Sequence, residues 1–222
     1  MNFNLLNGDC LIEMTKLDDN SIDVIYCDLP FQQTKCLWDK LIDLDKFWIE
    51  IIRIKKLHTP IIMSCNTKFG ISLINSAPKR CPYRYDIIHL QSSSSGFLRS
   101  GKQPLRKHQL IYFFYEREPY YDISSHNKVL IRTTSQPKYS PPLPHSLLEI
   151  KSTRGKHSTE KPVGLMEWIL KYYSKIGDIV LDPTMGSGSM GIACKNMNRR
   201  FIGIEMNKEI FSIATNRIQD KN

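Results

Sequence analysis

The stretch VLDPTMGSGSMGIACKNMNRRFIGIEMN, residues 180–207, contains two short apolar segments separated by a glycine-rich turn and a helical pattern. The first segment ends at Asp182, the helix is expected to begin near Ser189, and the second segment ends at Glu205. Strand, glycine turn, helix and strand in this order form the repeating unit of a parallel, doubly wound sheet. The stretch therefore predicts an α/β fold.

The same alternation extends over the rest of the chain. Short runs rich in β-branched and aromatic residues predict further strands, and apolar residues at helical spacing predict helices. The expected strands are 23–28, 60–65, 86–91, 109–115, 178–182 and 201–205, with 3–6 as a weaker seventh, and the expected helices are 44–57, 162–173 and a last one capped by Asn207. We expect a mostly parallel sheet of about seven strands with helices on both faces.

Two segments interrupt this alternation. Residues 117–156 are rich in Pro, Ser and Tyr and follow neither period, so we expect an irregular insertion there. Residues 91–107 predict a second long loop. Neither segment is typical of a linker between domains, and there is no internal repeat. A chain of 222 residues is therefore expected to form a single domain.

Positive charge is concentrated in the middle of the chain. Thirty-one Lys and Arg residues against twenty-two Asp and Glu give a net charge of +9, and the basic residues are densest between Lys79 and Lys161. A basic middle between better-balanced flanks indicates a region that faces a polyanion such as nucleic acid.

Cysteine usage and the N-terminus indicate the compartment. The six cysteines are scattered, without the paired spacing of zinc sites, so we expect reduced thiols and no metal site; they are Cys10, Cys27, Cys36, Cys65, Cys81 and Cys194. The sequence has neither a signal-peptide pattern nor a membrane-spanning apolar stretch. The protein is expected to be intracellular, either cytoplasmic or associated with the genome, and not secreted.

The glycine turn suits a cofactor that contains a nucleoside. Glycine lets a ligand approach the backbone closely, and Glu205 is placed to accept hydrogen bonds from both hydroxyls of a ribose. Gly186, Gly188 and Gly191 also satisfy the GxGxxG pattern of dinucleotide sites, and an ordinary tight turn fits the segment as well. Asp182 before the turn favours a cationic cofactor, S-adenosylmethionine, over a pyrophosphate such as NAD.

The segment DLPF, residues 28–31, directly follows an expected strand. The Asp28 carboxylate and the Leu29 carbonyl offer two acceptors for the hydrogens of an exocyclic amino group on a base. Phe31 offers a ring for stacking, and Pro30 restricts Leu29 to extended geometry. An ordinary turn after a strand fits these four residues equally well.

Taken together, these segments resemble the permuted, β-class amino DNA methyltransferases. DLPF with Trp38 and Asp39 is similar to that family's catalytic motif, (D/N/S)PP(Y/F) followed by Trp-Asp. NGDC (7–10) resembles the family's segment that contacts the adenine of the cofactor, and the stretch 96–114 resembles the one that runs into a later strand of the sheet. HSTEKP (157–162) resembles the family's HPTQKP segment, DPTMGSGS (182–189) resembles its cofactor loop DPFxGSGT, and FIGIE (201–205) resembles its acidic strand. They cover nearly the whole chain in the order of the permuted class.

The resemblance implies a class I S-adenosylmethionine-dependent methyltransferase fold that spans residues 1–222, with an insertion for target recognition at about 117–156. The implied reaction transfers a methyl group to the N6 amino group of an adenine flipped out of double-stranded DNA, without a metal. The implied catalytic residues are Asp28, Leu29, Pro30 and Phe31. The implied cofactor residues are Asp9, Cys10, Asp28, Thr159, Lys161, Asp182, Thr184, Gly186, Gly188, Ser189 and Glu205. The cations expected to contact DNA phosphates, beside the catalytic edge, are Arg99, Lys102, Arg106 and Lys107.

Several departures from the family pattern keep alternatives open. Leu29 replaces a Pro, Thr184 replaces a Phe, and Ser158 and Glu160 replace Pro and Gln. The alternatives are a cytosine-N4 methyltransferase, although Asp at the first motif position resembles the adenine-specific members, and a non-catalytic DNA-binding protein that retains the fold. The oligomeric state, monomer or homodimer, also stays open. His126 is expected to be a surface or turn residue.

Overall fold

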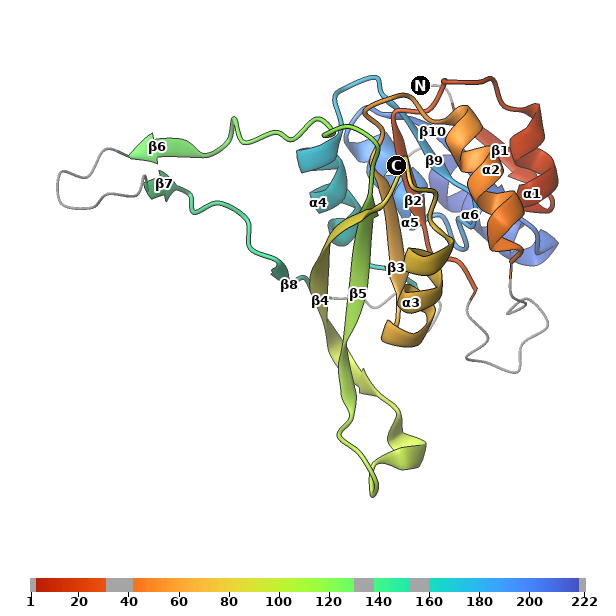
Figure 1. Ribbon diagram of the computed structural model, residues 1–222. Helices are drawn as coiled ribbons and strands as arrows, with labels where there is room; N and C mark the ends of the chain where they lie inside the picture. Colours follow the sequence, from red (N-terminus) through yellow and green to blue (C-terminus); the bar gives the residue numbers. More distant parts are fainter. Residues whose placement is uncertain (1–2, 31–41, 130–137, 152–159, 220–222) are drawn as a thin grey trace.

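The computed structural model describes residues 3–30, 42–129, 138–151 and 160–219. Its centre is a sheet of eight strands in the order β1-β10-β9-β2-β3-β5-β4-β8 (Figure 1). The strands are β1 (Phe3–Asn7), β2 (Val24–Cys27), β3 (Ile61–Cys65), β4 (Tyr83–Ser95), β5 (Arg106–Phe114), β8 (Leu147–Glu149), β9 (Ile179–Asp182) and β10 (Arg200–Glu205). The first five strands in this order are parallel, β5 is antiparallel to β3 and β4, and β8 is parallel to β4.

Helices cover both faces of the sheet, as the sequence predicts (Figure 1). They are α1 (Cys10–Glu13), α2 (Leu44–Ile54), α3 (Thr67–Ser76), α4 (Val163–Tyr173), α5 (Ser189–Asn196) and α6 (Lys208–Gln219), with short 3₁₀ turns η1 (Met14–Lys16) and η2 (Phe97–Arg99). In β2, Ile25 and Cys27 pack in one core with α2 and α3, whereas Val24 and Tyr26 pack in the other with α4, α5 and α6. Alternate side chains of a strand point to opposite faces, so this fully buried strand supplies both cores.

Residues 91–107 differ from the expected loop, because they form the outer part of a long β hairpin. β4 continues to Ser95 and β5 starts at Arg106, and Ser95 pairs with Arg106. The register between the two strands shifts between this pair and the Leu90–His108 pair. The run of serines hides the strand, since no core lies beside this part and an apolar face is not required. Figure 1 shows the hairpin extending well beyond the other strands.

The described residues of the segment 117–156, which are 117–129 and 138–151, are largely irregular, as expected, but they include three short strands. β6 (Asn127–Val129) and β7 (Lys138–Ser140) form a separate antiparallel ribbon, which Figure 1 shows away from the main sheet, and β8 becomes the eighth strand of that sheet. His126 closes a turn, as expected, because its N–H donates to the Ile123 carbonyl at 2.9 Å, but it is not a surface residue, since its side chain is buried. Its Nδ1 lies 2.9 Å from the carbonyl oxygen of Pro141 and its Nε2 3.0 Å from the hydroxyl of Tyr172 on α4. These contacts fix the base of the ribbon to the body of the protein.

The strand order creates a switch point between β9 and β2. From β9 the chain continues to β10 on one side, and from β2 it continues to β3 on the other side. Loops at the carboxyl ends of two such strands diverge and leave a crevice, which is where open α/β sheets bind ligands. The segments that follow Asp182 and Cys27 both begin at this crevice.

Candidate active site at the switch point of the sheet

Asp28 follows the last residue of β2 and presents two unlike carboxylate oxygens. Its Oδ2 accepts a hydrogen bond from the ammonium of Lys161, with which it forms an ion pair. Its Oδ1 is buried and has no hydrogen-bond partner among the residues that the structure describes. The backbone N–H of Asp28 donates to Thr184 Oγ1 at 3.3 Å. One oxygen is therefore held in place, while the other is available to a donor from outside.

The residues after Asp28 show how the loop tolerates its departure from the family pattern. Leu29 is 1% exposed, and its side chain packs in the core formed by β2, β3 and α2. Pro30 is half-buried. Leu29 thus anchors the loop by packing at a position where the family uses the rigidity of a proline. Phe31 lies outside the described residues.

The glycine turn after β9 needs its two glycines for different reasons. Gly186 and Gly188 both have left-handed backbone angles, with φ of 52° and 86°, which glycine adopts without strain. A Cβ at Gly186 would meet nothing within 4 Å, so this backbone borders open space where a ligand can approach. A Cβ at Gly188 would lie 2.9 Å from Ile218 Cδ1, because α6 packs against the start of α5.

Glu205, the last residue of β10, faces this turn. Its Oε2 accepts the Gly186 N–H at 3.1 Å and its Oε1 accepts the Asn207 N–H at 2.8 Å. A carboxylate has about four lone-pair sites, so both oxygens retain capacity for two further donors. Burial raises the pKa of Glu205 above its ordinary value, which the two backbone donors partly oppose.

Asp182 adds a third carboxylate to the same edge of the sheet. It is 3% exposed, and its Oδ1 accepts the Thr184 N–H at 3.1 Å. Burial raises the pKa of Asp182 well above its ordinary value, and the charges of Asp28 and Glu205 act in the same direction. A cationic ligand would relieve the repulsion among these carboxylates and a pyrophosphate would add to it, so the crevice fits S-adenosylmethionine better than NAD.

The end of β1 closes another side of the crevice. The Gly8 N–H and the Asn7 side-chain amide both donate to the Glu205 carbonyl, at 3.1 and 2.8 Å. Asp9 is exposed and caps α1 by accepting the Leu11 N–H at 2.8 Å. Burial, with the nearby Asp9 charge, raises the pKa of Cys10 to about 12, so its thiol stays neutral.

Arg217 on α6 contacts the glycine turn, although no sequence motif indicates it. It donates to the Ser187 carbonyl at 2.6 Å and pairs with Glu160, which also accepts from Ser189 Oγ at 3.4 Å. Glu160, which replaces the family's Gln, therefore has a cationic partner. Lys161 follows it directly, so these contacts connect the turn to the lysine that holds Asp28. Thr159 lies outside the described residues.

The four cations expected to contact DNA lie on the β4–β5 hairpin. β3 ends at Cys65, which pairs with Leu110 of β5, so every hairpin residue before Leu110 lies beyond the edge that carries Asp28. The side chains are exposed or half-exposed: Arg99, Lys102, Arg106 and Lys107. The hairpin therefore places positive charge beyond the sheet edge that carries Asp28.

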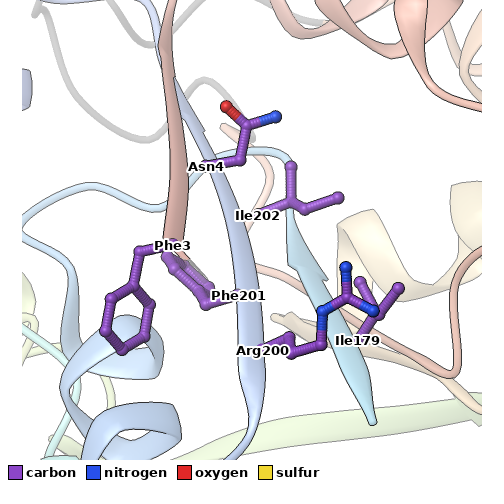
Figure 2. A pocket seen from close by; sticks show the side chains of 6 residues that line it. All are labelled: Phe3, Asn4, Ile179, Arg200, Phe201 and Ile202. Atoms are coloured by element: carbon purple, nitrogen blue, oxygen red, sulfur yellow. The ribbon is translucent and has the colours of Figure 1, made fainter. Parts of the chain in front are cut away.

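A hollow of about 360 Å³ lies at the opposite edge of the sheet (Figure 2). Phe3, Ile179 and Arg200, the first residues of β1, β9 and β10, line it together with Asn4, Phe201 and Ile202. None of the residues expected to bind a cofactor or a base is part of it. In the described parts of the chain, moreover, no three His, Cys, Asp or Glu side chains form a group that could hold a metal ion, and no helix is long and apolar enough to cross a bilayer.

Comparison with known proteins places these features in a family. A family model described as DNA methylase, for N6 and N4 methyltransferases, matches residues 22–216. Among curated proteins, the type II methyltransferase M2.MboI of Moraxella bovis is 26% identical over 99% of this chain and 88% of that protein. M2.DpnII of Streptococcus pneumoniae is 43% identical, but the match covers 33% of this chain and 28% of that protein.

Solved structures agree on the fold. The cytosine-N4-specific PvuII DNA methyltransferase matches 100% of this chain and 88% of its own with a TM-score of 0.76 at 18% identity. The M1.HpyAVI–SAM complex matches 98% of this chain and 100% of its own with a TM-score of 0.71 at 21% identity. The fold is thus the class I S-adenosylmethionine-dependent methyltransferase fold, and the chain belongs to the DNA methylase family of N6 and N4 amino methyltransferases.

Proposed function

We propose that this chain transfers a methyl group from S-adenosylmethionine to the exocyclic N6 amino group of adenine in double-stranded DNA. The observation that carries the proposal is the buried Oδ1 of Asp28 beside the glycine turn, which has no hydrogen-bond partner in the described part of the chain. An unsatisfied buried carboxylate oxygen costs free energy, and a donor from the substrate would recover it.

Asp28 and Leu29 would act on the base. The lone pair of an exocyclic amino nitrogen is delocalised into the ring, so the nitrogen is a poor nucleophile. The Asp28 Oδ1 and the Leu29 carbonyl would accept its two hydrogens and favour the pyramidal nitrogen of the transition state. The nitrogen becomes positively charged as the new bond forms and then loses a proton, and the Asp28 carboxylate can stabilise that charge and accept the proton. Phe31 would stack on the base.

The crevice between β9 and β2 would hold the cofactor. S-adenosylmethionine supplies a methyl group on a positively charged sulfur. Glu205 would accept hydrogen bonds from the ribose hydroxyls, Asp182 and the Gly186 backbone would line the rest of the crevice, and Asp9 and Cys10 would contact the adenine. The open space at Gly186 and the three carboxylates around it fit a large cationic cofactor.

The two parts that leave the sheet would bind DNA. The hairpin cations would contact phosphates, and the insertion at about 117–156 would select the target sequence within one domain of 222 residues. The expected substrate is genomic DNA inside the cell. Asp at the first position of the catalytic motif favours adenine over cytosine, as in the family members with that residue.

Methyl transfer from labelled S-adenosylmethionine to plasmid DNA of mixed sequence tests the proposal, with the digested nucleosides identified by mass spectrometry. We expect N6-methyladenine. N4-methylcytosine would instead show the cytosine specificity, and no transfer would favour a DNA-binding protein without turnover.

The matched variant is Asp28→Ala. It should lower turnover roughly a hundredfold or more, because it removes an acceptor that acts mainly in the transition state. Calorimetry should show that the variant still binds S-adenosylmethionine. Near-normal turnover in this variant would rule out the role of Asp28.

A further inference from the structure

The tip of the β4–β5 hairpin exposes two large apolar side chains. Phe97 is 65% exposed, and Leu98, the next residue of η2, is fully exposed. Gly96 before them has a φ of 87°, which turns the chain sharply at the end of β4. Adjacent exposed apolar side chains at the end of a projecting arm mark a contact surface more often than isolated ones do.

The charge around the tip identifies the class of partner. The segment GFLRSGKQPLRK, residues 96–107, contains four cations and no acidic residue. An apolar pair followed closely by four cations is complementary to duplex DNA, in which phosphates lie outside and the apolar faces of the bases lie inside. A neutral protein surface would not require these cations.

The length of the hairpin is sufficient for insertion. The sheet edge lies at the Cys65–Leu110 pair, and β5 begins four residues earlier, at Arg106. At about 3.3 Å per residue, the strand alone extends roughly 13 Å beyond the edge that carries Asp28. This length exceeds the major-groove depth of about 8.5 Å. DNA held at the catalytic edge is therefore within reach of the tip.

We infer that Phe97 and Leu98 form an apolar wedge that enters the base stack of the duplex next to the target base. The inference rests on the proposed function, since a base that leaves the stack opens an apolar gap that a side chain can fill. Apolar side chains inserted between base steps occur in other DNA-binding proteins, where apolar contact offsets the loss of stacking. The cations beside the wedge would hold the phosphates on either side of the opened step.

A tryptophan at the tip tests insertion directly. Phe97→Trp, mixed with plasmid DNA of mixed sequence, should lose fluorescence and become shielded from acrylamide, because the indole stacks on bases. Ile176→Trp is the matched control, since Ile176 is 76% exposed and precedes β9 at the opposite edge of the sheet. The parent protein provides the background of the native tryptophans. Unchanged tip fluorescence while a mobility shift demonstrates DNA binding would overturn the inference.

Removal of the wedge tests its role in base access. In the Phe97→Ala/Leu98→Ala variant, the ratio of duplex to single-stranded methylation, measured on DNA of one sequence, should fall at least tenfold. An unchanged ratio would overturn the inference, as would a change from dimer to monomer in sedimentation, which would make the tip a contact between copies of the chain. If the parent transfers no methyl group to any DNA, the proposed function fails, and the tryptophan experiment still decides whether the tip enters DNA.

Discussion

The two oxygens of Asp28 have different surroundings, which suits the substrate role that we propose for this residue. Lys161 holds Oδ2 and thereby fixes the plane of the carboxylate, so that Oδ1 remains buried without a partner in the described structure. The ammonium also balances part of the negative charge at this edge. We therefore propose that Lys161 is a positioning residue that would act on the base through Asp28, in addition to the cofactor contact expected from the sequence.

We predict that Lys161→Ala lowers kcat roughly tenfold to a hundredfold, because a hydrogen bond to a charged group contributes about 1.5–3 kcal/mol. The KM for DNA should change little, and Lys161→Arg should recover part of the loss. Steady-state kinetics with calorimetry of S-adenosylmethionine binding separates the two roles. Weakened cofactor binding with normal kcat would assign Lys161 to the cofactor alone.

Asp182 couples the stability of the cofactor-free protein to pH. Because its pKa is raised in the folded state, the folded chain binds more protons than the unfolded chain above the ordinary pKa of an aspartate. The contribution to stability is complete below that pKa and is lost as pH rises toward the raised value. Each pKa unit corresponds to about 1.4 kcal/mol.

The variant Asp182→Asn should lack this loss and can keep the hydrogen bond from the Thr184 N–H. We predict that its free energy of unfolding, relative to the parent, increases as the pH rises above the ordinary pKa of an aspartate. Urea unfolding at several pH values measures the difference, with the exposed Asp18→Asn as control. Parallel curves for parent and Asp182→Asn would show that Asp182 titrates normally.

At the scale of elements, the third glycine of GxGxxG has a packing role. Gly191 lies inside α5, and a Cβ there would be 2.4 Å from Ile218 Cδ1 and 2.8 Å from Phe201 Cε1. The glycine thus permits α5 to approach both α6 and β10. In this chain the dinucleotide-like pattern arises from two turn positions, Gly186 and Gly188, and one helix contact.

Gly191→Ala should lower the free energy of unfolding by about 1–3 kcal/mol, the cost of overpacking, although alanine favours helix. Gly101→Ala, which has open space around it, is the control and should be nearly neutral. Adding Ile218→Val should recover part of the loss in urea unfolding, because it removes the methyl group that the new Cβ meets. A stabilised single variant would contradict this packing role.

The elements that the sequence predicts are those with their own local pattern. Strands β2, β3, β9 and β10 are short apolar runs, and α2, α4 and α6 have an apolar stripe, so each is recognisable alone. α3 is missed because Gly70 interrupts its pattern, and the structure explains this glycine by Tyr112, whose ring lies 2.6 Å from a hypothetical Cβ. The outer part of β4 is missed because its serines face solvent on both sides.

For the candidate site, too, the sequence predicts what lies within a local motif and misses what depends on distant segments. Motifs of adjacent residues place Asp28, Asp182 and Glu205 correctly at one edge of the sheet. The pairing of Asp28 with Lys161 joins residues 133 positions apart, and that of Glu160 with Arg217 joins residues 57 apart. No local pattern specifies such pairs, because they depend on how distant segments meet at the switch point.

At the scale of the whole molecule, two arms leave the sheet in different directions, the β4–β5 hairpin and the β6–β7 ribbon (Figure 1). The hairpin extends past the edge that carries Asp28 and has exposed cations, whereas the ribbon is fixed to α4 through His126. Phosphate contacts supply affinity without sequence information, and contacts to base edges supply specificity. We therefore expect the two arms to divide affinity and specificity between them.

Two pairs of substitutions separate these roles. Arg106→Ala/Lys107→Ala should weaken binding to target and random DNA by similar factors and lower the salt slope by about two, one for each lost phosphate contact, with the methylated sequence unchanged. Asn127→Ala/Tyr139→Ala on the ribbon should change the methylated sequence, because Asn can read the edge of a base. Asn4→Ala, exposed at the opposite edge, is the control.

Binding isotherms at several salt concentrations and sequencing of modified bases in a methylated plasmid measure both effects. If affinity and specificity are divided as expected, the hairpin pair shifts only the isotherms and the ribbon pair shifts only the sequence pattern. A hairpin variant that binds normally at every salt concentration would remove the phosphate role. A ribbon variant that modifies the same sequence as the parent would show that Asn127 and Tyr139 do not read bases, and target selection would then have to come from the segments that surround Asp28.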